Sequence, residues 1–225
     1  MCGKFTQRKN LPWREFHDLL DMIGTEKAGD APPPEVETIT PMRFVPILRL
    51  DAQGEREWVP MRWGFSALSA ANPAKPDHIH ARAETIDVKP TFRAAFRERR
   101  GVLLVDSFNE GEELTPSKTL QYVVTPESGG LLAIAVLWEA WHHDGGGELL
   151  TFVMATVPPN NLLGEKFDRM PAVLAPDDIP AWLGEIEATP DELKAMLVTT
   201  EGRWDLSPEK KTPPPRKPTP QGELF

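Results

Sequence analysis

The clearest indication of the fold is the sequence FVPILRL at 44–50, the turn DAQG at 51–54, and the sequence EWVPMRW at 57–63. Both flanking runs are rich in the branched and aromatic side chains that favour strands, and the short connection contains a glycine. This pattern predicts a β-hairpin. The chain around it should therefore build on antiparallel pairing.

The segments that follow the hairpin alternate between strand and short-helix patterns. Strands are predicted at 102–105, 121–125, 131–138 and 149–156, and the last three should form an antiparallel meander. Helices are predicted at 12–23, at 91–100, near 178–183, and from a capping box that begins at Thr189. Residues 24–38 and 66–77 are expected to be loops. Because regular strand–helix–strand alternation is missing, the fold class is α+β on an antiparallel sheet.

Composition divides the chain into a domain at 1–206 and a tail at 207–225. In the tail, Lys210, Lys211, Arg216 and Lys217 alternate with prolines, and large apolar residues return only in the last two positions. A segment of this kind cannot bury a core, so we expect disorder there.

Net charge and cysteine usage limit the function. The net charge of −9 disfavours a dedicated binder of duplex DNA, so any contact with nucleic acid needs a local basic patch. No apolar run is long enough to span a bilayer, and the first residues do not form a secretory signal, which favours a cytoplasmic protein without membrane contact. A single cysteine excludes an internal disulfide and a cysteine zinc site.

That single cysteine, Cys2, has a position that suggests chemistry. Removal of Met1 gives Cys2 a free α-amine beside its thiol. An aldehyde can then form a Schiff base with the amine, and the thiol can close a five-membered thiazolidine ring. The alternatives are an N-terminal nucleophile that hydrolyses amides, and a small buried side chain without chemistry.

Six short motifs in the same order resemble the SRAP family, named for SOS-response-associated peptidases and understood as abasic-site processing proteins. They are MCGKF at 1–5, RWGF at 62–65, ARAET at 81–85, DSFNE at 106–110, LWE at 137–139 and RMPAVL at 169–174. The resemblance implies an open, barrel-like antiparallel sheet with peripheral helices, no cofactor, and a monomer. It also implies a thiazolidine crosslink to the ring-opened abasic sugar in single-stranded DNA, within an SOS-type response to DNA damage.

The resemblance also assigns roles to individual residues. Cys2 becomes the nucleophile, and Glu110 becomes the acid that moves protons during ring formation. Arg82 matches a residue that contacts the DNA backbone, and Lys4, Arg43 and Arg62 can add to a basic groove around Cys2. Trp63 and Pro41 match positions that present apolar surface to bases, although a strand tryptophan is equally typical of a core.

Several positions depart from the family pattern. His80 replaces an asparagine that orients the N-terminus, and it can donate a hydrogen bond in its place but would introduce pH dependence. Phe167 replaces a histidine that assists reversal of the crosslink, and phenylalanine cannot transfer a proton. Gly111 replaces a tryptophan. Two hypotheses follow. The chain is either an active variant that relies on His80 or a degenerate paralogue that binds DNA without crosslinking it. Retention of Cys2 and Glu110 favours the first hypothesis. His142 and His143 are alternative proton carriers, although a polar loop explains them more simply.

The last five residues carry a second motif. Gln221, Leu224 and Phe225 form the pattern Gln-x-x-Leu-Phe, which resembles the motif that docks bacterial replication and repair proteins on the sliding clamp. Two apolar anchors on a tether suit a hydrophobic pocket, and the tether raises the effective concentration of the domain at the clamp. A chance match of this length is the alternative.

Overall fold

The computed structural model of the 225-residue chain describes residues 2–8, 36–67, 76, 78–142 and 147–209. The strands are β1 Lys4–Arg8, β2 Val36–Ile39, β3 Phe44–Leu50, β4 Arg56–Trp63, β5 His80–Arg82, β6 Arg100–Val105, β7 Ser107–Thr115, β8 Lys118–Pro126, β9 Leu132–His142, β10 Glu148–Val157, β11 Met170–Pro171 and β12 Trp204–Pro208. The helices are α2 Arg93–Glu98, α3 Asn161–Gly164, α4 Ile179–Leu183 and α5 Pro190–Ala195, with 3-10 turns η1 Ala83–Thr85 and η2 Pro176–Asp178.

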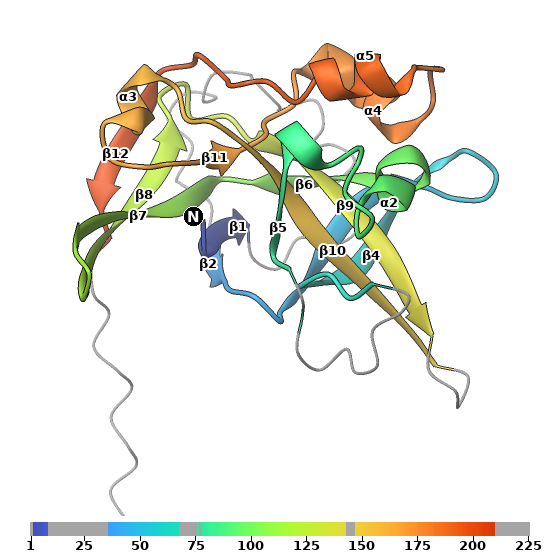
Figure 1. Ribbon diagram of the computed structural model, residues 1–225, viewed down its shortest axis with the longest axis horizontal. Coiled ribbons are helices and arrows are strands. Elements are labelled where there is room, and N and C mark those ends of the chain that lie inside the picture. Colours follow the sequence, from blue (N-terminus) through green and yellow to red (C-terminus); the bar gives the residue numbers. More distant parts are fainter. Residues whose placement is uncertain (1, 9–35, 68–75, 77, 143–146, 210–225) are drawn as a thin grey trace, which may run out of the picture.

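The strands form two sheets that meet around one core (Figure 1). In the larger sheet the pairings run from β10 through β4, β3, β6 and β9 and return to β10, so they close a barrel. The smaller sheet has the order β12-β8-β7-β1-β2. Figure 1 shows the helices along the upper side of the molecule, with α3 near β12 and β8 and with α4 and α5 at the opposite end. This arrangement confirms the α+β, barrel-like fold, although the β4–β10 pairing is parallel.

The predicted hairpin is confirmed as β3 and β4, with Leu48 opposite Trp58. Its turn is held by Asp51, whose carboxylate accepts hydrogen bonds from the main-chain nitrogens of Gln53 and Glu55. Gly54 has φ 82°, a left-handed conformation that glycine adopts without steric cost. Local turn chemistry therefore explains why this hairpin forms where the sequence predicts it.

The expected meander is only half correct. β9 and β10 pair antiparallel, but β8 lies in the smaller sheet between β7 and β12. The chain passes from one sheet to the other at Asp106. β6 ends at Val105 in the barrel, and β7 begins at Ser107 in the smaller sheet. Because β8 pairs with β7, it is carried away from β9.

Other predictions were corrected at the ends of elements. β2 begins at Val36, inside the expected loop at 24–38, and β12 continues to Pro208, past residue 206. The capping box at Thr189 is confirmed: Thr189 accepts from the nitrogen of Glu192, whose carboxylate accepts from the nitrogen of Thr189. The predicted helix at 12–23 and most of the tail lie outside the described residues.

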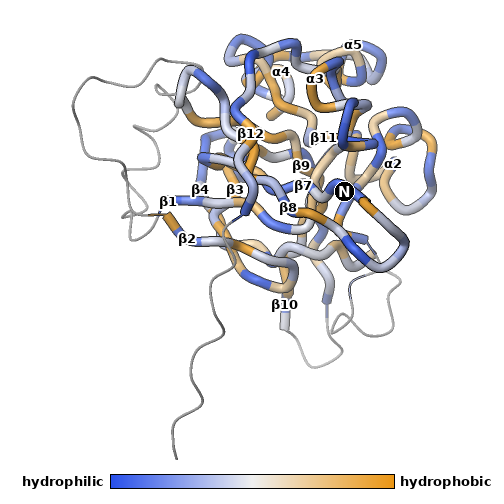
Figure 2. The backbone as a smooth tube through the Cα atoms, turned by 90° about the vertical axis from the view of Figure 1, so that its left-hand side faces the viewer, coloured by the Kyte–Doolittle hydropathy of each residue, from blue (hydrophilic) through white to orange (hydrophobic). Residues whose placement is uncertain are grey.

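Side-chain burial follows the strand pattern. Phe5 and Phe108 face each other across β1 and β7, and both are fully buried. Figure 2 shows hydrophobic and hydrophilic residues interspersed along the strands, as expected where one face of each strand is buried. Among the described residues, none of the helices has the length and apolarity needed to cross a bilayer.

Candidate active site around Cys2

Cys2 lies two residues before the first residue of β1, and the pairing of that strand fixes its surroundings. Lys4 lies opposite Asn109 and Phe5 lies opposite Phe108, so the start of the chain runs beside the segment that carries Glu110. The thiol donates a hydrogen bond to the main-chain oxygen of Lys4 at 3.1 Å. Cys2 is 1% exposed in this chain, which still contains Met1.

Burial controls the protonation of the Cys2 thiol. It raises the pKa of Cys2 to about 12, and the negative charge of Glu110 adds to the effect. The thiol is therefore protonated at neutral pH, and the sulfur is not a preformed thiolate. Glu110 follows Asn109, the partner of Lys4 across β1 and β7, so the same register places it beside the residues that precede Lys4.

Glu110 lies in β7 and is 1% exposed. Burial raises the pKa of Glu110 above its ordinary value, while hydrogen bonding with the main chain of Gly111 and Cys2 opposes the rise. A carboxyl group with a raised pKa can hold and release a proton nearer to neutral pH than an exposed glutamate can. This is the property that the predicted acid–base role requires.

His80 brings a third element to the site. It lies in β5, which pairs with β10, and its ring contacts Trp63 edge-on with 6.1 Å between ring centroids. Burial lowers the pKa of His80 to about 4, and the nearby main chain of Cys2 partly opposes this, although neither ring nitrogen forms a well-shaped hydrogen bond with a described residue. His80 is therefore neutral at pH 7. The structure thus brings His80 of β5 and Glu110 of β7 together with Cys2, which lies just before β1.

Two predicted DNA contacts are corrected by burial. Trp63 is 0% exposed, stacks with Phe152, and donates from its indole nitrogen to the oxygen of Ile79 at 3.0 Å. A fully buried indole cannot stack on a base, so the core alternative is the correct one. Arg62 is also buried, and it donates to Ser66 Oγ at 3.0 Å and to the oxygen of Gly64. It contributes to folding rather than to a surface groove.

The other predicted contacts differ in accessibility. Arg82 and Arg43 are exposed, and Pro41 is half-buried in a turn beside the exposed side chains of Met42 and Phe44. Lys4 is only partly exposed, and its charge is paired with Glu209 at 2.9 Å. Of this group, Arg82 and Arg43 are the cations open to a phosphate.

The aromatic contact of Phe167 and the close approach of His142 both involve residues outside the candidate site. Phe167 is buried, and its ring packs edge-on against Tyr122 with 5.8 Å between centroids. His142 lies in the exposed end of β9, 3.9 Å from Glu148. His143, Gln221, Leu224 and Phe225 lie outside the described residues.

One contributing residue was not assigned from the sequence. Arg169 forms a two-pronged ion pair with Glu84 and also donates to the oxygen of Thr156. This joins η1 to β10 directly beside β5, and the positive charge of Arg169 helps keep His80 neutral. The signal was present, because Arg169 and Glu84 belong to two of the quoted motifs.

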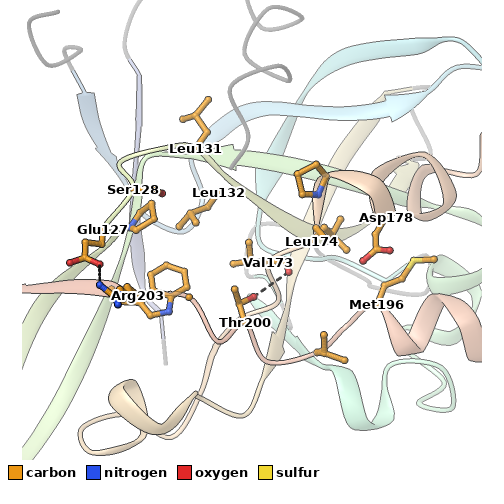
Figure 3. Close-up of a pocket in the computed structure, with 16 residues that line it drawn as sticks. Glu127, Ser128, Leu131, Leu132, Val173, Leu174, Asp178, Met196, Thr200 and Arg203 are labelled. Atoms are coloured by element: carbon orange, nitrogen blue, oxygen red, sulfur yellow. Dashed lines mark hydrogen bonds and ion pairs between the residues drawn. The ribbon is translucent and has the colours of Figure 1, made fainter. Parts of the chain in front are cut away.

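Two hollows open on the surface of the described chain. The larger, of about 960 Å³, lies between the start of β9 and the segment after α5, and Figure 3 shows Leu131, Leu174 and Met196 in its wall. None of Cys2, His80 and Glu110 lines it. The second, of about 730 Å³, has His80 and Arg82 in its wall and therefore lies against the candidate site.

The fold and site together define a class of protein, an α+β barrel in which Cys2, near the start of the chain, lies close to a buried glutamate and a neutral histidine. The model of the SOS response associated peptidase (SRAP) family matches residues 1–210, and the chain belongs to this family.

Individual relatives agree with this assignment. The chain is 30% identical over 201 residues to the abasic site processing protein YoqW of Bacillus subtilis, covering 88% of this chain and 86% of YoqW. It is 30% identical over 167 residues to the abasic site processing protein HMCES of Xenopus tropicalis, covering 63% of this chain and 50% of HMCES. A crystal structure of a protein from Bordetella bronchiseptica shares the fold, with a TM-score of 0.73 at 20% identity over 93% of this chain and 100% of that protein.

Proposed function

We propose that this protein processes abasic sites in single-stranded DNA by forming a thiazolidine between Cys2 and the ring-opened sugar. The observation that carries the proposal is the convergence of Cys2, just before β1, with Glu110 of β7 and His80 of β5. Membership of the SRAP family and the names of the curated relatives support it. An SOS-type response to DNA damage is the setting we propose for this activity.

The reaction uses both nucleophiles of a free N-terminal cysteine. After Met1 is removed, the α-amine of Cys2 adds to the sugar aldehyde and the adduct loses water, which leaves an imine. Sγ then forms a bond to the imine carbon while its proton is transferred to the nitrogen, and the five-membered ring is complete. The net change is one new C–N bond, one new C–S bond and one released water.

The order of the two steps follows from the protonation states. Because the pKa of the Cys2 thiol is about 12, sulfur is the poorer nucleophile at neutral pH and the amine reacts first. Glu110 can accept the thiol proton and return it to nitrogen. His80, which is neutral at pH 7, orients the main chain of Cys2 rather than carrying a proton. The pH dependence expected from the titration of His80 should therefore occur in the acid range, well below pH 7.

DNA is held by local rather than global charge. Arg82 is the exposed cation nearest to the site along β5, and Pro41 with its exposed neighbours Met42 and Phe44 offers apolar surface to bases. An abasic nucleotide has no base to unstack, so little energy is needed to bring its sugar to Cys2.

The test is intact-mass spectrometry of the protein before and after incubation with a single-stranded oligonucleotide that contains one abasic site. We expect a mature protein without Met1, and then an adduct that equals protein plus oligonucleotide minus one water. Cys2→Ser retains the amine but should lose the heat-stable adduct, and an undamaged oligonucleotide is the matched control. Wild-type protein without Met1 that forms no adduct would refute the proposal and leave the amidase or a non-crosslinking DNA binder as the alternatives.

As a separate proposal, the segment 221–225 docks on the sliding clamp. It rests on the sequence pattern alone, with Leu224 and Phe225 as anchors. Purified clamp should retain the wild-type chain and the Cys2→Ser variant, and it should lose the variant with Leu224→Ala and Phe225→Ala. Equal retention of all three would contradict a clamp motif.

A further inference from the structure

The hollow of about 960 Å³, to which the candidate site contributes no residue, has a largely apolar lining. Leu131, Leu174 and Met196 belong to it, and Figure 3 shows all three around the opening. Val198 adds an aliphatic side chain that is 57% exposed. This volume lies within the range of sites that bind a ligand, and the lining favours an apolar one.

The indole of Trp204 gives the same hollow a specific polar requirement. Trp204 lines the hollow, is 7% exposed, and packs edge-on against Phe108 with 5.7 Å between ring centroids. Its indole nitrogen has no hydrogen-bond acceptor in the part of the chain that the structure describes. A buried donor without an acceptor is costly, and a ligand that places a carbonyl oxygen there removes the cost. The hollow therefore suits a peptide, which carries both apolar side chains and carbonyl oxygens.

Arg203 supplies a positive charge at the edge of the hollow. Its side chain is 88% exposed and lies 3.7 Å from the carboxylate of Glu127, which is longer than a hydrogen bond. Figure 3 shows this pair at one side of the hollow. Because an exposed pair of this length contributes little to folding, Arg203 can exchange Glu127 for an acidic group on a ligand.

The segment 210–225 of the same chain has the chemistry that the hollow requires. Its large apolar residues are Leu224 and Phe225, and Glu223 directly precedes them. An acidic residue beside two apolar residues matches Arg203 beside an apolar lining. The other charged residues of the segment are all lysine or arginine, whereas the whole chain has a net charge of −9. Electrostatic attraction therefore draws the segment toward the domain.

The connection between hollow and segment is long enough. Trp204 is the first residue of β12, and Glu209 follows the end of that strand. At about 3.3 Å per residue, Glu209 lies roughly 17 Å along the chain from Trp204. Residues 210–223 span up to about 40 Å in an extended, proline-rich conformation. The segment can therefore return to the hollow, and its tether gives it a high effective concentration there.

We infer that the hollow binds residues 223–225 of its own chain. Leu224 and Phe225 pack on the apolar lining, and Glu223 pairs with Arg203. A main-chain oxygen of the segment accepts a hydrogen bond from the indole nitrogen of Trp204.

This docking has a consequence for the proposed clamp motif, because Leu224 and Phe225 are also its anchors. A molecule whose anchors lie in the hollow cannot present them to the sliding clamp, so the clamp affinity of the whole chain is reduced by the docked fraction. The competition rests on the clamp proposal, whereas the docking does not.

The docking is tested on the full chain through the nuclear magnetic resonance signal of the Trp204 indole N–H, which is assigned by its loss in Trp204→Phe. The double variant Leu224→Ala with Phe225→Ala should move this signal and speed its hydrogen exchange by about tenfold or more, because the indole loses its acceptor and its cover. The matched control is Pro218→Ala with Thr219→Ala, which keeps the anchors and should change neither.

Two results would overturn the docking. One is a Trp204 signal that is unchanged when both anchors are removed. The other is a signal that depends on protein concentration together with a doubled molecular mass, which would show that a second copy of the chain occupies the hollow.

The competition is tested with Val198→Glu, which places a negative charge in the exposed wall of the hollow. Its matched control is Ile186→Glu, since Ile186 is also 57% exposed but does not line the hollow. Val198→Glu should release the anchors and strengthen binding to purified sliding clamp by roughly threefold to tenfold, whereas Ile186→Glu should bind like wild type. The other indole signals check that each variant is folded.

The outcomes separate the two proposals. Clamp binding that is equal in Val198→Glu and Ile186→Glu overturns the competition. Failure of every variant to bind the clamp rejects the clamp proposal, while the Trp204 signal still decides whether the segment docks.

Discussion

The amino group of Lys4 lies 2.9 Å from the carboxylate of Glu209, and this ion pair connects the strand that follows Cys2 to the end of β12. Glu209 is fixed in turn by its main-chain nitrogen, which donates to the oxygen of Gln121 at 2.8 Å. Both charged side chains are partly exposed, so the pair contributes at most about 1 kcal/mol to folding. Its larger consequence is that the charge of Lys4 is already balanced.

Lys4→Gln should therefore change the affinity for single-stranded DNA by less than about twofold, because little free charge is lost. Arg82→Gln should weaken binding by about tenfold, since Arg82 is exposed and has no ion pair among the described residues. Fluorescence titration with a labelled oligonucleotide measures both. A larger loss for Lys4→Gln than for Arg82→Gln would show that DNA displaces Glu209.

His80 should make the fold sensitive to acid. Its pKa in the folded chain is about 4, below the ordinary value of 6.5, so above pH 6.5 the residue is neutral in both states and has no effect. As the pH falls from 6.5 to 4, His80 binds a proton in the unfolded chain but stays neutral in the folded chain. The free energy of unfolding therefore decreases by up to about 3 kcal/mol. Urea unfolding at several pH values measures this loss.

The matched variant for that experiment is His80→Asn, which places the family's usual residue at the position and cannot titrate. Carboxylates contribute equally to both proteins, so the difference between them isolates His80. Wild type should lose more stability than His80→Asn between pH 6.5 and pH 4. Parallel curves over this range would mean that the ring reaches solvent and titrates normally.

Local sequence patterns predicted the barrel strands well because each is long or is bounded by a turn with known chemistry. β3 has the predicted bounds, and its turn depends on Asp51 and Gly54, which act within a few residues. Six strands were missed: β1, β2, β5, β7, β11 and β12. Except for β7, which pairs with the next strand β8, each of them pairs only with strands that lie more than a short turn away along the chain. β5, for example, is a strand only because His80 and Arg82 pair with Met154 and Thr156 of β10.

The order of the motifs was enough to predict which residues form the candidate site, but it could not predict how deeply each of them is buried. The sequence contains no information on how deep a side chain lies, and this is why Trp63 and Arg62 were expected at the DNA surface. Depth also decides the chemistry. It moves the pKa of Cys2 upward and that of His80 downward, so the pH dependence expected of His80 falls in the acid range.

Glu110→Gln should separate stability from activity. Burial raises the pKa of Glu110, so the folded state is penalised for holding the charged form at neutral pH, and the penalty disappears below the ordinary pKa of 4.5. The variant should therefore unfold at higher urea than wild type at pH 7, with the difference vanishing in acid. Adduct formation at pH 7 should slow by about a hundredfold or more. A variant that is less stable at pH 7 would mean that the carboxylate is held by favourable contacts.

Gly64 explains why the matched motif at 62–65 contains a glycine. Its φ is 129°, and a Cβ added there would lie 2.7 Å from Cβ of Pro76. Gly64→Ala should destabilise the fold by about 1–3 kcal/mol from the backbone conformation, with the steric clash added. Thermal unfolding compared with Gly147→Ala, where nothing lies within 4 Å, gives the measurement and its control.

Phe167→His tests the most consequential departure from the family. A histidine at this position is the family residue that assists reversal of the crosslink, and Phe167 is buried against Tyr122 with no group that can carry a proton. Wild type should therefore hold its adduct, and Phe167→His should release DNA faster. Phe167→Gln controls for the lost ring contact, because glutamine is polar but does not titrate. Release is measured as free oligonucleotide over time after excess abasic DNA is removed. Because both variants lose the same packing, faster release by the histidine variant alone assigns the effect to proton transfer, and equal release by both assigns it to loosened packing around Tyr122.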